Sequence, residues 1–302
     1  MKTKFIGFLL LTCLIIFFIN TQAYTIYIIQ SETNEMYDSM IYSFKERADF
    51  DFVSFNLDGK KGAAKDILKL IGTNNPDAIL LIGLEAIKDI GPSVSTIPVI
   101  ISMVSGVPQE VKNKSNVCGV LFDANDADIV GFIKSSFPKL KTLGIIFNMQ
   151  NSLDHAKTFR EKAIEKGLSV ELGNIKSFEE LIPTLKLFKA SGVDAIWLGK
   201  DKMLLSKTGF DAFLKATKDE GIPIIAPYTT FTQKGAAFSV SPSIANHGFI
   251  AGNLAIRLSN GETPSEIGIV KTTKLSLSYN KNMMKLFSLE VLESVLMGAK
   301  EY

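Results

Sequence analysis

Cysteine is scarce in this sequence, and its scarcity limits how the fold can be held together. Only Cys13 and Cys118 occur among the 302 residues, and Cys13 lies inside an apolar N-terminal stretch that we expect to be removed. A single remaining thiol cannot form an intrachain disulfide, so the fold must depend on its hydrophobic core. Cys118 lies within another apolar run, which predicts a buried and unreactive thiol.

Groups suited to catalysis are equally few. The two histidines, His155 and His247, each lie on a predicted helix and have no partner at the spacing of a metal site or a catalytic triad. We therefore expect both imidazoles to be solvated. The sequence also contains no glycine-rich phosphate loop. It predicts no catalytic residue, no metal site and no cofactor, and it favours a binding protein over an enzyme.

An excess of charge of either sign is missing as well. The chain has 33 basic and 31 acidic side chains. Without Lys2 and Lys4, which lie in the N-terminal stretch, the two counts become equal at 31. A neutral chain offers no extended basic surface, so we expect no nucleic-acid partner.

The first 23 residues have the layout of a secretory signal peptide. Two lysines precede an apolar run over residues 5–19, and residues 21–23 form a passable cleavage site. Removing residues 1–23 leaves a chain long enough for two domains, which we expect to find in the periplasm. An uncleaved membrane anchor is the alternative to cleavage.

Two stretches of the remaining chain echo each other. Residues 77–83 and 194–199 each begin with aspartate, continue as an apolar run and end in glycine. A helical stretch follows in both, and then a second apolar run with proline at its start, at 97–100 and 222–225. Continuous apolar runs that alternate with helices are typical of parallel sheets covered by helices on both faces. The predicted fold class is α/β, with two doubly wound parallel-sheet lobes.

The same alternation of strands and helices runs through the rest of the chain. A predicted helix stops before Pro138, where the pattern restarts, and this point predicts a short junction between the lobes. Residues 269–279 are expected to form a long final strand, and residues 281–297 a terminal helix.

The candidate site lies at the carboxyl ends of the predicted strands, where loops and helix N-termini present polar groups to ligands. These ends carry hydroxyl, amide, carboxylate, aromatic and thioether groups, a mixture that suits a small zwitterion or another polar organic molecule. Some of them are expected to serve only as caps or turn residues. The candidate ligand-binding residues are Ser31, Gly83, Leu84, Glu85, Met103, Phe122, Asp123, Asn148, Asn151, Ser152, Lys200, Asp201, Tyr228 and Thr229.

Several short motifs occur in an order that resembles a known family. They are Gly83-Leu84-Glu85-Ala86, Ile97-Pro98-Val99-Ile100, the run Pro138 to Asn148, Val193-Asp194-Ala195-Ile196, Lys234-Gly235-Ala236 and Gly261-Glu262-Thr263-Pro264-Ser265. On these motifs the chain resembles the solute-binding proteins of ABC transporters with the type I periplasmic-binding fold. Within them it is similar to the branch related to tryptophan- and tyrosine-type binding proteins.

The resemblance implies two lobes that close on one ligand, joined by a hinge that the chain crosses three times. By that pattern residues 24–138 and 241–268 form lobe 1, and residues 139–240 and 269–302 form lobe 2. The resemblance also implies an extracytoplasmic protein that hands its ligand to the membrane permease of an ABC importer, and we expect this protein to be a monomer. A sensory protein that reports to a membrane signalling partner is the alternative, because either partner could read lobe closure.

The resemblance places Asn148, Asn151, Ser152 and Asp201 in the ligand site. Asn151 and Ser152 would offer donors to a carboxylate, and Asp201 would accept from an ammonium group. Because Asp201 precedes an apolar helical run, a helix cap is its alternative role.

The sequence departs from the family pattern at two points. Leu84, followed by Glu85, stands where the family usually has threonine after the strand glycine, and Lys200 stands where it usually has threonine before Asp201. Two hydroxyl donors are lost, and one charge of each sign is gained. These changes weaken the case for an ordinary amino acid. The expected ligand is a small, polar, amino-acid-like molecule, with an aromatic group as one option.

Overall fold

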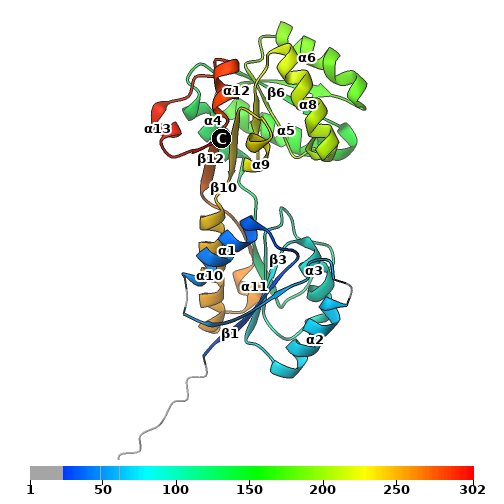
Figure 1. Ribbon diagram of the computed structural model, residues 1–302, viewed down its shortest axis with the longest axis vertical. Helices are drawn as coiled ribbons and strands as arrows, with labels where there is room; N and C mark the ends of the chain where they lie inside the picture. The colour runs from blue at the N-terminus through cyan, green and yellow to red at the C-terminus, as the bar shows by residue number, and fades with distance from the viewer. Residues whose placement is uncertain (1–22, 48, 61) are drawn as a thin grey trace, which may run out of the picture.

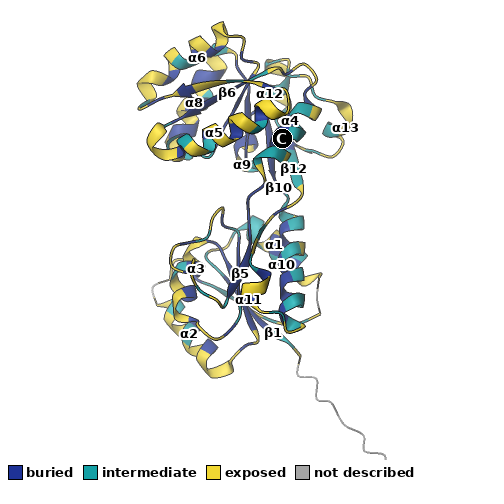
Figure 2. Cartoon of the chain, turned by 180° about the vertical axis from the view of Figure 1, so that it is seen from behind, coloured by how far each residue is buried: buried dark blue, intermediate teal, exposed yellow. Residues whose placement is uncertain are grey.

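The computed structural model describes residues 23–47, 49–60 and 62–302, so nearly all of the predicted signal peptide lies outside the described residues. The described chain folds into two lobes joined by a narrow waist (Figure 1). Buried residues concentrate along the strands of each lobe, and exposed residues on the outer helices (Figure 2). No helix in this described part is long and apolar enough to cross a membrane.

The first lobe is built on a six-stranded, fully parallel sheet with the strand order β2-β1-β3-β4-β5-β11. Helices cover both of its faces. Its elements are β1 (Thr25–Gln30), α1 (Glu35–Lys45), β2 (Asp51–Asn56), α2 (Ala63–Asn74), β3 (Ala78–Ile82), α3 (Leu84–Ile90), the 3-10 turn Gly91–Ser93, β4 (Val99–Ser102), β5 (Val117–Leu121), α10 (Ile244–Ser259), α11 (Pro264–Ile267) and β11 (Ile269–Lys271).

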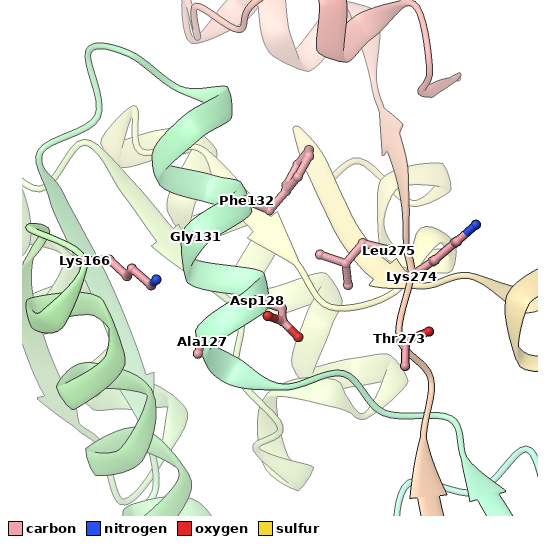
Figure 3. Close-up of a pocket in the computed structure, with 8 residues that line it drawn as sticks. All are labelled: Ala127, Asp128, Gly131, Phe132, Lys166, Thr273, Lys274 and Leu275. Carbon is pink, nitrogen blue, oxygen red and sulfur yellow. The ribbon is translucent and has the colours of Figure 1, made fainter.

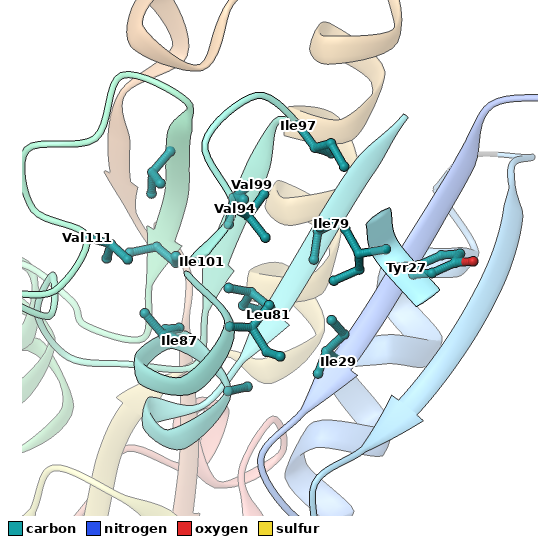
Figure 4. Close-up of a cluster of buried hydrophobic side chains, with 14 of the residues drawn as sticks. Tyr27, Ile29, Ile79, Leu81, Ile87, Val94, Ile97, Val99, Ile101 and Val111 are labelled. Atoms are coloured by element: carbon teal, nitrogen blue, oxygen red, sulfur yellow. The ribbon is translucent and has the colours of Figure 1, made fainter. Parts of the chain in front are cut away.

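The continuous apolar runs of this sheet are explained by its two buried faces. Odd-numbered residues of β1 and β3, such as Tyr27 and Leu81, pack toward α2 and α3 (Figure 4). Even-numbered residues, such as Ile28 and Leu80, pack toward α1 and α10. Since successive side chains of a strand point to opposite faces, a strand covered on both sides must be apolar throughout.

The second lobe is built on a seven-stranded sheet with the order β7-β6-β8-β9-β10-β12-β13. Strands β6 to β10 are parallel, β12 is antiparallel to β10, and β13 is parallel to β12. Helices α4, α5, α12 and α13 pack on one face, and α6, α7, α8 and α9 on the other. The predicted class of two doubly wound α/β lobes is confirmed, with β12 as an antiparallel addition.

The elements of this lobe are α4 (Asp126–Ser136), β6 (Thr142–Phe147), α5 (Met149–Glu165), β7 (Ser169–Asn174), the 3-10 turn Phe178–Glu180, α6 (Leu181–Ala190), β8 (Ala195–Trp197), α7 (Lys202–Leu205), α8 (Lys207–Glu220), β9 (Ile224–Ala226), α9 (Thr229–Gln233), β10 (Phe238–Pro242), β12 (Leu275–Tyr279), α12 (Lys281–Leu286), α13 (Glu293–Leu296) and β13 (Lys300–Glu301).

The aspartates that open the two echoing stretches have the same structural task in each lobe. Asp77 precedes β3, and its Oδ2 accepts a hydrogen bond from the backbone N–H of Thr25 at 2.7 Å. Asp194 precedes β8, and its Oδ2 accepts from the N–H groups of Lys141 and Thr142 at 2.7 and 2.8 Å. Each carboxylate therefore satisfies backbone donors at the start of the neighbouring strand, which explains why aspartate begins both copies.

The chain crosses the waist three times, but two crossings differ from the expected positions. Helix α4 packs in the core of the second lobe through residues such as Ile129 and Ile133, so the first crossing lies at 122–125 and not near Pro138. The expected strand over 269–279 is two strands: β11 pairs with β5 in the first lobe, and β12 pairs with β10 in the second. The third crossing is therefore at 272–274. The second, between β10 and α10, lies within three residues of the expected boundary.

Helices α1 and α10 approach each other closely because α10 presents glycine at their contact. A Cβ on Gly248 would lie 2.4 Å from the carbonyl oxygen of Met40, and one on Gly252 would lie 2.6 Å from the Cβ of Arg47. Since the backbone of α1 cannot yield as a flexible side chain could, any larger residue at these positions must push the helices apart.

We predict that Gly248→Ala lowers the free energy of unfolding by about 1–3 kcal/mol, the usual cost of overpacking. Gly131→Ala in α4 is the matched control, because the nearest atom to its added Cβ is the Lys166 side chain at 4.0 Å. That control should be neutral or stabilising by up to about 1 kcal/mol, since alanine favours the helix. Urea unfolding of both variants measures the difference, and equal stabilities would show that the α1–α10 contact tolerates a methyl group.

Candidate functional site

The carboxyl-end edges of both sheets lie beside the waist. Strands β5 and β11 end where the chain leaves the first lobe, and β10 ends where it leaves the second. The neighbouring strands run parallel to these, so their ends lie along the same two edges. The strand ends that carry the predicted residues of both lobes therefore lie toward the waist, which Figure 1 shows between the two lobes.

In the first lobe, Ser31 and Gly83 shape the turn from β3 into α3. The Ser31 hydroxyl donates to the carbonyl of Ile82 at 3.0 Å and accepts from the N–H of Ala86 at 2.9 Å. Gly83 has a φ of +86°, and a Cβ there would lie 2.4 Å from the Tyr37 hydroxyl. Both predicted residues therefore shape the backbone of this turn, Ser31 through hydrogen bonds and Gly83 through its positive φ.

The next two residues of this turn remain available to a ligand. Leu84 is 43% exposed although it is a large apolar residue, and Glu85 is also exposed. The structure therefore exposes Leu84, one of the two points of departure from the family pattern, and the anionic Glu85 that follows it, at the start of α3.

His247, which we expected to be solvated, is fully buried at the waist. The N–H of Met103 donates to its Nε2 at 3.2 Å, and the Ser102 hydroxyl lies 2.9 Å from the same atom. Because Nε2 accepts, Nδ1 carries the proton and donates to the Thr272 hydroxyl at 2.8 Å, which in turn donates to the carbonyl of Leu121 at 3.1 Å. We call these residues the hinge clasp.

The hinge clasp joins the ends of β4 and β5 to the third crossing through one neutral imidazole. Burial lowers the pKa of His247 from 6.5 to about 3, because a charged ring could not be hydrated there. The ring of Phe122 packs edge-on against it, with 5.3 Å between the ring centroids. Phe122 also stacks on Tyr228 of the second lobe, with 6.3 Å between the ring centroids and 14° between the rings, so Phe122 connects the clasp to the second lobe.

Asp123 joins the lobes electrostatically. Its Oδ1 accepts from the ammonium of Lys200, which follows β8 in the second lobe, and its Oδ2 accepts from Lys271 of β11 at 2.9 Å. Burial tends to raise the pKa of Asp123, but the hydrogen bonds from the two lysines outweigh burial and hold it below the usual value. Among the ion pairs that the structure describes, Lys200–Asp123 is the one that ties the second lobe to the first crossing.

In the second lobe, Asp201 holds the start of α5 against the start of α7. Its Oδ2 accepts from the N–H of Asn148 at 2.8 Å and from the Ser152 hydroxyl at 2.6 Å. Its Oδ1 accepts from the N–H groups of Met203 and Leu204 at 2.9 and 3.3 Å. These four bonds use the acceptor capacity of a carboxylate, and Asp201 is only 1% exposed. The helix-cap role expected as its alternative is confirmed, while contact with a ligand stays a prediction.

An open pocket of ≈ 370 Å³ lies at the start of α5, and it contains several predicted residues. Asn151 is exposed, Ser152 is bound to Asp201, and Lys200 reaches in from the end of β8. The residues around it are Met149, Gln150, Asn151, Ser152, Leu153, Asp154, His155 and Lys200. Thr229, by contrast, is engaged with Ser241, their hydroxyl oxygens lying 3.2 Å apart.

A larger, more open pocket of ≈ 610 Å³ lies between α4 and the start of β12 (Figure 3). It contains none of the predicted residues. We regard the pocket at α5 as the better candidate, because it lies at strand ends and helix N-termini where this fold presents its donors. The residues around the larger pocket are Ala127, Asp128, Gly131, Phe132, Lys166, Thr273, Lys274 and Leu275.

Sequence reasoning missed three residues of this region: His247, His155 and Lys271. His155 was also expected to be solvated, yet burial lowers its pKa despite the nearby Asp126 carboxylate, 3.6 Å from Nδ1. For His247 a signal existed, because its spacing from Ala251 and Leu254 puts it on the buried stripe of α10. The sequence did not indicate a role for Lys271, because residues 269–279 were predicted to form one strand of lobe 2, whereas β11 belongs to the first lobe.

The buried imidazole of His247 predicts a pH dependence of stability. A pKa of about 3 in the folded state, against 6.5 unfolded, makes its contribution complete above pH 6.5 and progressively lost as the pH falls toward 3. Above pH 5, where few carboxylates titrate, the wild type should lose up to about 1.4 kcal/mol per pH unit more than His247→Gln. Urea unfolding between pH 7.5 and 5 measures both slopes, and parallel slopes would contradict a neutral His247.

The four hydrogen bonds of Asp201 predict a structural cost for its amide variant. Asp201→Asn places an NH2 group against existing donors, so it should lower the free energy of unfolding by about 1–3 kcal/mol. The exposed Asp211→Asn on α8 is the matched control, expected within about 0.5 kcal/mol of wild type. Thermal and urea unfolding test this, and an undiminished stability of Asp201→Asn would reopen its role as a ligand contact.

The chain is similar to known proteins over most of its length, and this similarity identifies its family. The family model described as ABC transporter substrate binding protein matches residues 43–302. A curated relative, a tyrosine-binding protein from Clostridioides difficile (strain R20291), is 23% identical over 241 residues, covering 76% of this chain and 65% of the relative. The chain thus matches somewhat less than two thirds of that relative's length.

Two solved structures share the fold. The first, an ABC domain in complex with L-Trp from Streptococcus pneumonia, is 22% identical with a TM-score of 0.58, covering 92% of this chain and 99% of that chain. The second, a ligand-free, open substrate-binding protein with adhesive properties from Clostridium difficile, is 18% identical with a TM-score of 0.74, covering 93% and 99%. The resemblance drawn from the motifs is confirmed at the level of the family, and the chain belongs to the family of ABC transporter substrate-binding proteins.

Proposed function

We propose that this chain is an exported, monomeric solute-binding protein that captures a small amino-acid-like molecule and delivers it to the permease of an ABC importer. The observation that carries the proposal is the meeting of two strand-end edges at a waist that the chain crosses three times. Membership in the substrate-binding family supports a small-molecule ligand and a membrane transporter partner, as well as a role outside the cytoplasm and without catalysis.

The ligand would lie between Leu84 and Glu85 of the first lobe and the start of α5 in the second. Asn151 offers an exposed side-chain amide there, and Asp201 would act by fixing the positions of Asn148 and Ser152. The stacked rings of Phe122 and Tyr228 would supply apolar surface beside the crossings. Relatives described with tyrosine and with L-Trp support an aromatic, amino-acid-like ligand.

Closure of the lobes would complete the site. The exposed Leu84, Glu85 and Asn151 indicate that both edges are open in the described conformation. The short crossings at 122–125 and 272–274 allow a rotation about the waist without a change inside either core. The hinge clasp would keep the ends of β4, β5 and the third crossing together during that motion.

The ligand proposal is tested by releasing small molecules from freshly purified, denatured protein for mass spectrometry, followed by calorimetry with the identified compound, L-tyrosine and L-tryptophan. We expect binding of at least one of them, accompanied by a smaller radius of gyration in X-ray scattering. Leu187→Ala, an exposed position on α6, is the control and should bind like wild type. Binding with an unchanged scattering profile at saturation would contradict lobe closure.

A sensory role with a membrane signalling partner is the second candidate, and the family match favours import over it. Uptake of the labelled ligand by host cells, with and without the gene, separates them. Loss of uptake in the deletion strain supports the importer, and unchanged uptake with a lost transcriptional response supports the sensor.

A further inference from the structure

The charged side chains at the proposed ligand site differ in how many hydrogen-bond or ion-pair partners they already have within the protein. Asp201 has four protein donors, so it has no remaining acceptor site for a ligand ammonium in this conformation. Asp123 has two lysine partners, one on each oxygen. Both carboxylates that are buried among the described residues, Asp123 and Asp201, are thus already paired, and Lys200 is the lysine that borders the pocket at α5.

Lys200 lies where a ligand bound at α5 would meet it. It follows Gly199 at the end of β8 and borders the open pocket together with Asn151, Ser152 and His155. Its side chain is 27% exposed, so its ammonium is only partly hydrated. Asp154 borders the same pocket but is exposed, whereas Ser152 and Ala156 mark the buried side of the helix.

The shared carboxylate makes Lys200 exchangeable. Asp123 is neutralised by two ammonium groups, and the two lysines with one carboxylate leave a net positive charge. If Lys200 turns away, Lys271 still pairs with Asp123 at 2.9 Å, so the buried carboxylate is not left alone. A ligand anion could therefore replace Asp123 as the partner of Lys200 without leaving an unpaired charge on either side.

We propose that Lys200 is a specificity-determining residue that selects ligands with a carboxylate, by exchanging its bond to Asp123 for a bond to the ligand anion when the lobes close. This inference rests on the proposed function and names the ligand chemistry of that same site. A charge-assisted bond made inside a closed, water-excluding cleft is stronger than one at the surface. The opposite end of the ligand would then face Leu84 and Glu85, where an ammonium or an apolar group is accommodated.

The test compares probes that differ only in the carboxylate: L-tyrosine with tyramine, and L-tryptophan with tryptamine. Calorimetry on wild type should show binding of an amino acid and at least about thirtyfold weaker binding of its amine, since a buried charge loses its partner. Lys200→Gln should lose about thirtyfold in affinity for the amino acid, and Lys200→Arg should recover most of it.

Two variants of the shared carboxylate cluster test the exchange itself. Lys271→Gln leaves Asp123 unpaired when Lys200 turns to the ligand, so it should also weaken amino-acid binding, and adding Asp123→Asn to it should restore the affinity. Asp123→Asn removes the competitor of the ligand anion and should bind the amino acid at least as tightly as wild type. Affinity of Lys200→Gln within threefold of wild type, or equal wild-type affinity for amine and amino acid, overturns the inference.

If wild type binds no probe, the proposed amino-acid ligand is wrong, and a separate measurement decides the role of Lys200. His155 and His247 are the chain's two histidines, so 15N-histidine NMR resolves the ring beside Lys200, assigned with His155→Gln. Sodium acetate, titrated against sodium chloride at equal ionic strength, should shift His155 saturably in wild type and not in Lys200→Gln. An identical response of both proteins overturns the inference.

Discussion

The neutral imidazole of His247 is the point on which the arrangement of the waist depends. It accepts from the end of β4 and donates to Thr272 of the third crossing, which is bonded in turn to the end of β5. These segments are distant in sequence but lie at the carboxyl ends of the neighbouring strands β4, β5 and β11, and the clasp links them beyond the last pairs of the sheet. Because a charged ring would have to be desolvated at this position, the hinge clasp works only with the proton on Nδ1 alone. Met103 donates its backbone N–H to this ring, and the ring of Phe122 packs edge-on against it.

Around this clasp, the residues that the sequence suggests for a ligand include two sets. The residues of one set already form hydrogen bonds within the protein. Ser31, Ser152 and Asp201 make these bonds at the starts of α3, α5 and α7. The other set, Leu84, Glu85, Asn151 and Lys200, follows the strand ends that lie toward the waist. In the proposed site, the first set would fix the backbone around the second, and the second would contact the ligand.

The α/β class could be predicted because both faces of each sheet are buried, which turns strands such as β3 into unbroken apolar runs. The lobe of each element was harder to predict, since α4 and β11 are determined by packing partners far away in the sequence. Pro138 ends a helix inside the second lobe and marks no domain boundary. The sequence predicted which polar residues follow the strands. It did not predict that Asp201 accepts four hydrogen bonds or that Asp123 pairs with two lysines, because those donors come from several segments. Only three-dimensional contacts reveal those donors.

In the proposed function, the ligand is held between the two strand-end edges and not in the larger pocket between α4 and β12. Hydrogen–deuterium exchange of the full chain, with and without a saturating concentration of the compound that co-purifies with it, distinguishes these two locations. Binding between the strand-end edges should give new protection at residues 83–87, 148–153 and 199–205, with residues 127–132 and 273–276 unchanged. Protection confined to residues 127–132 and 273–276 would contradict it.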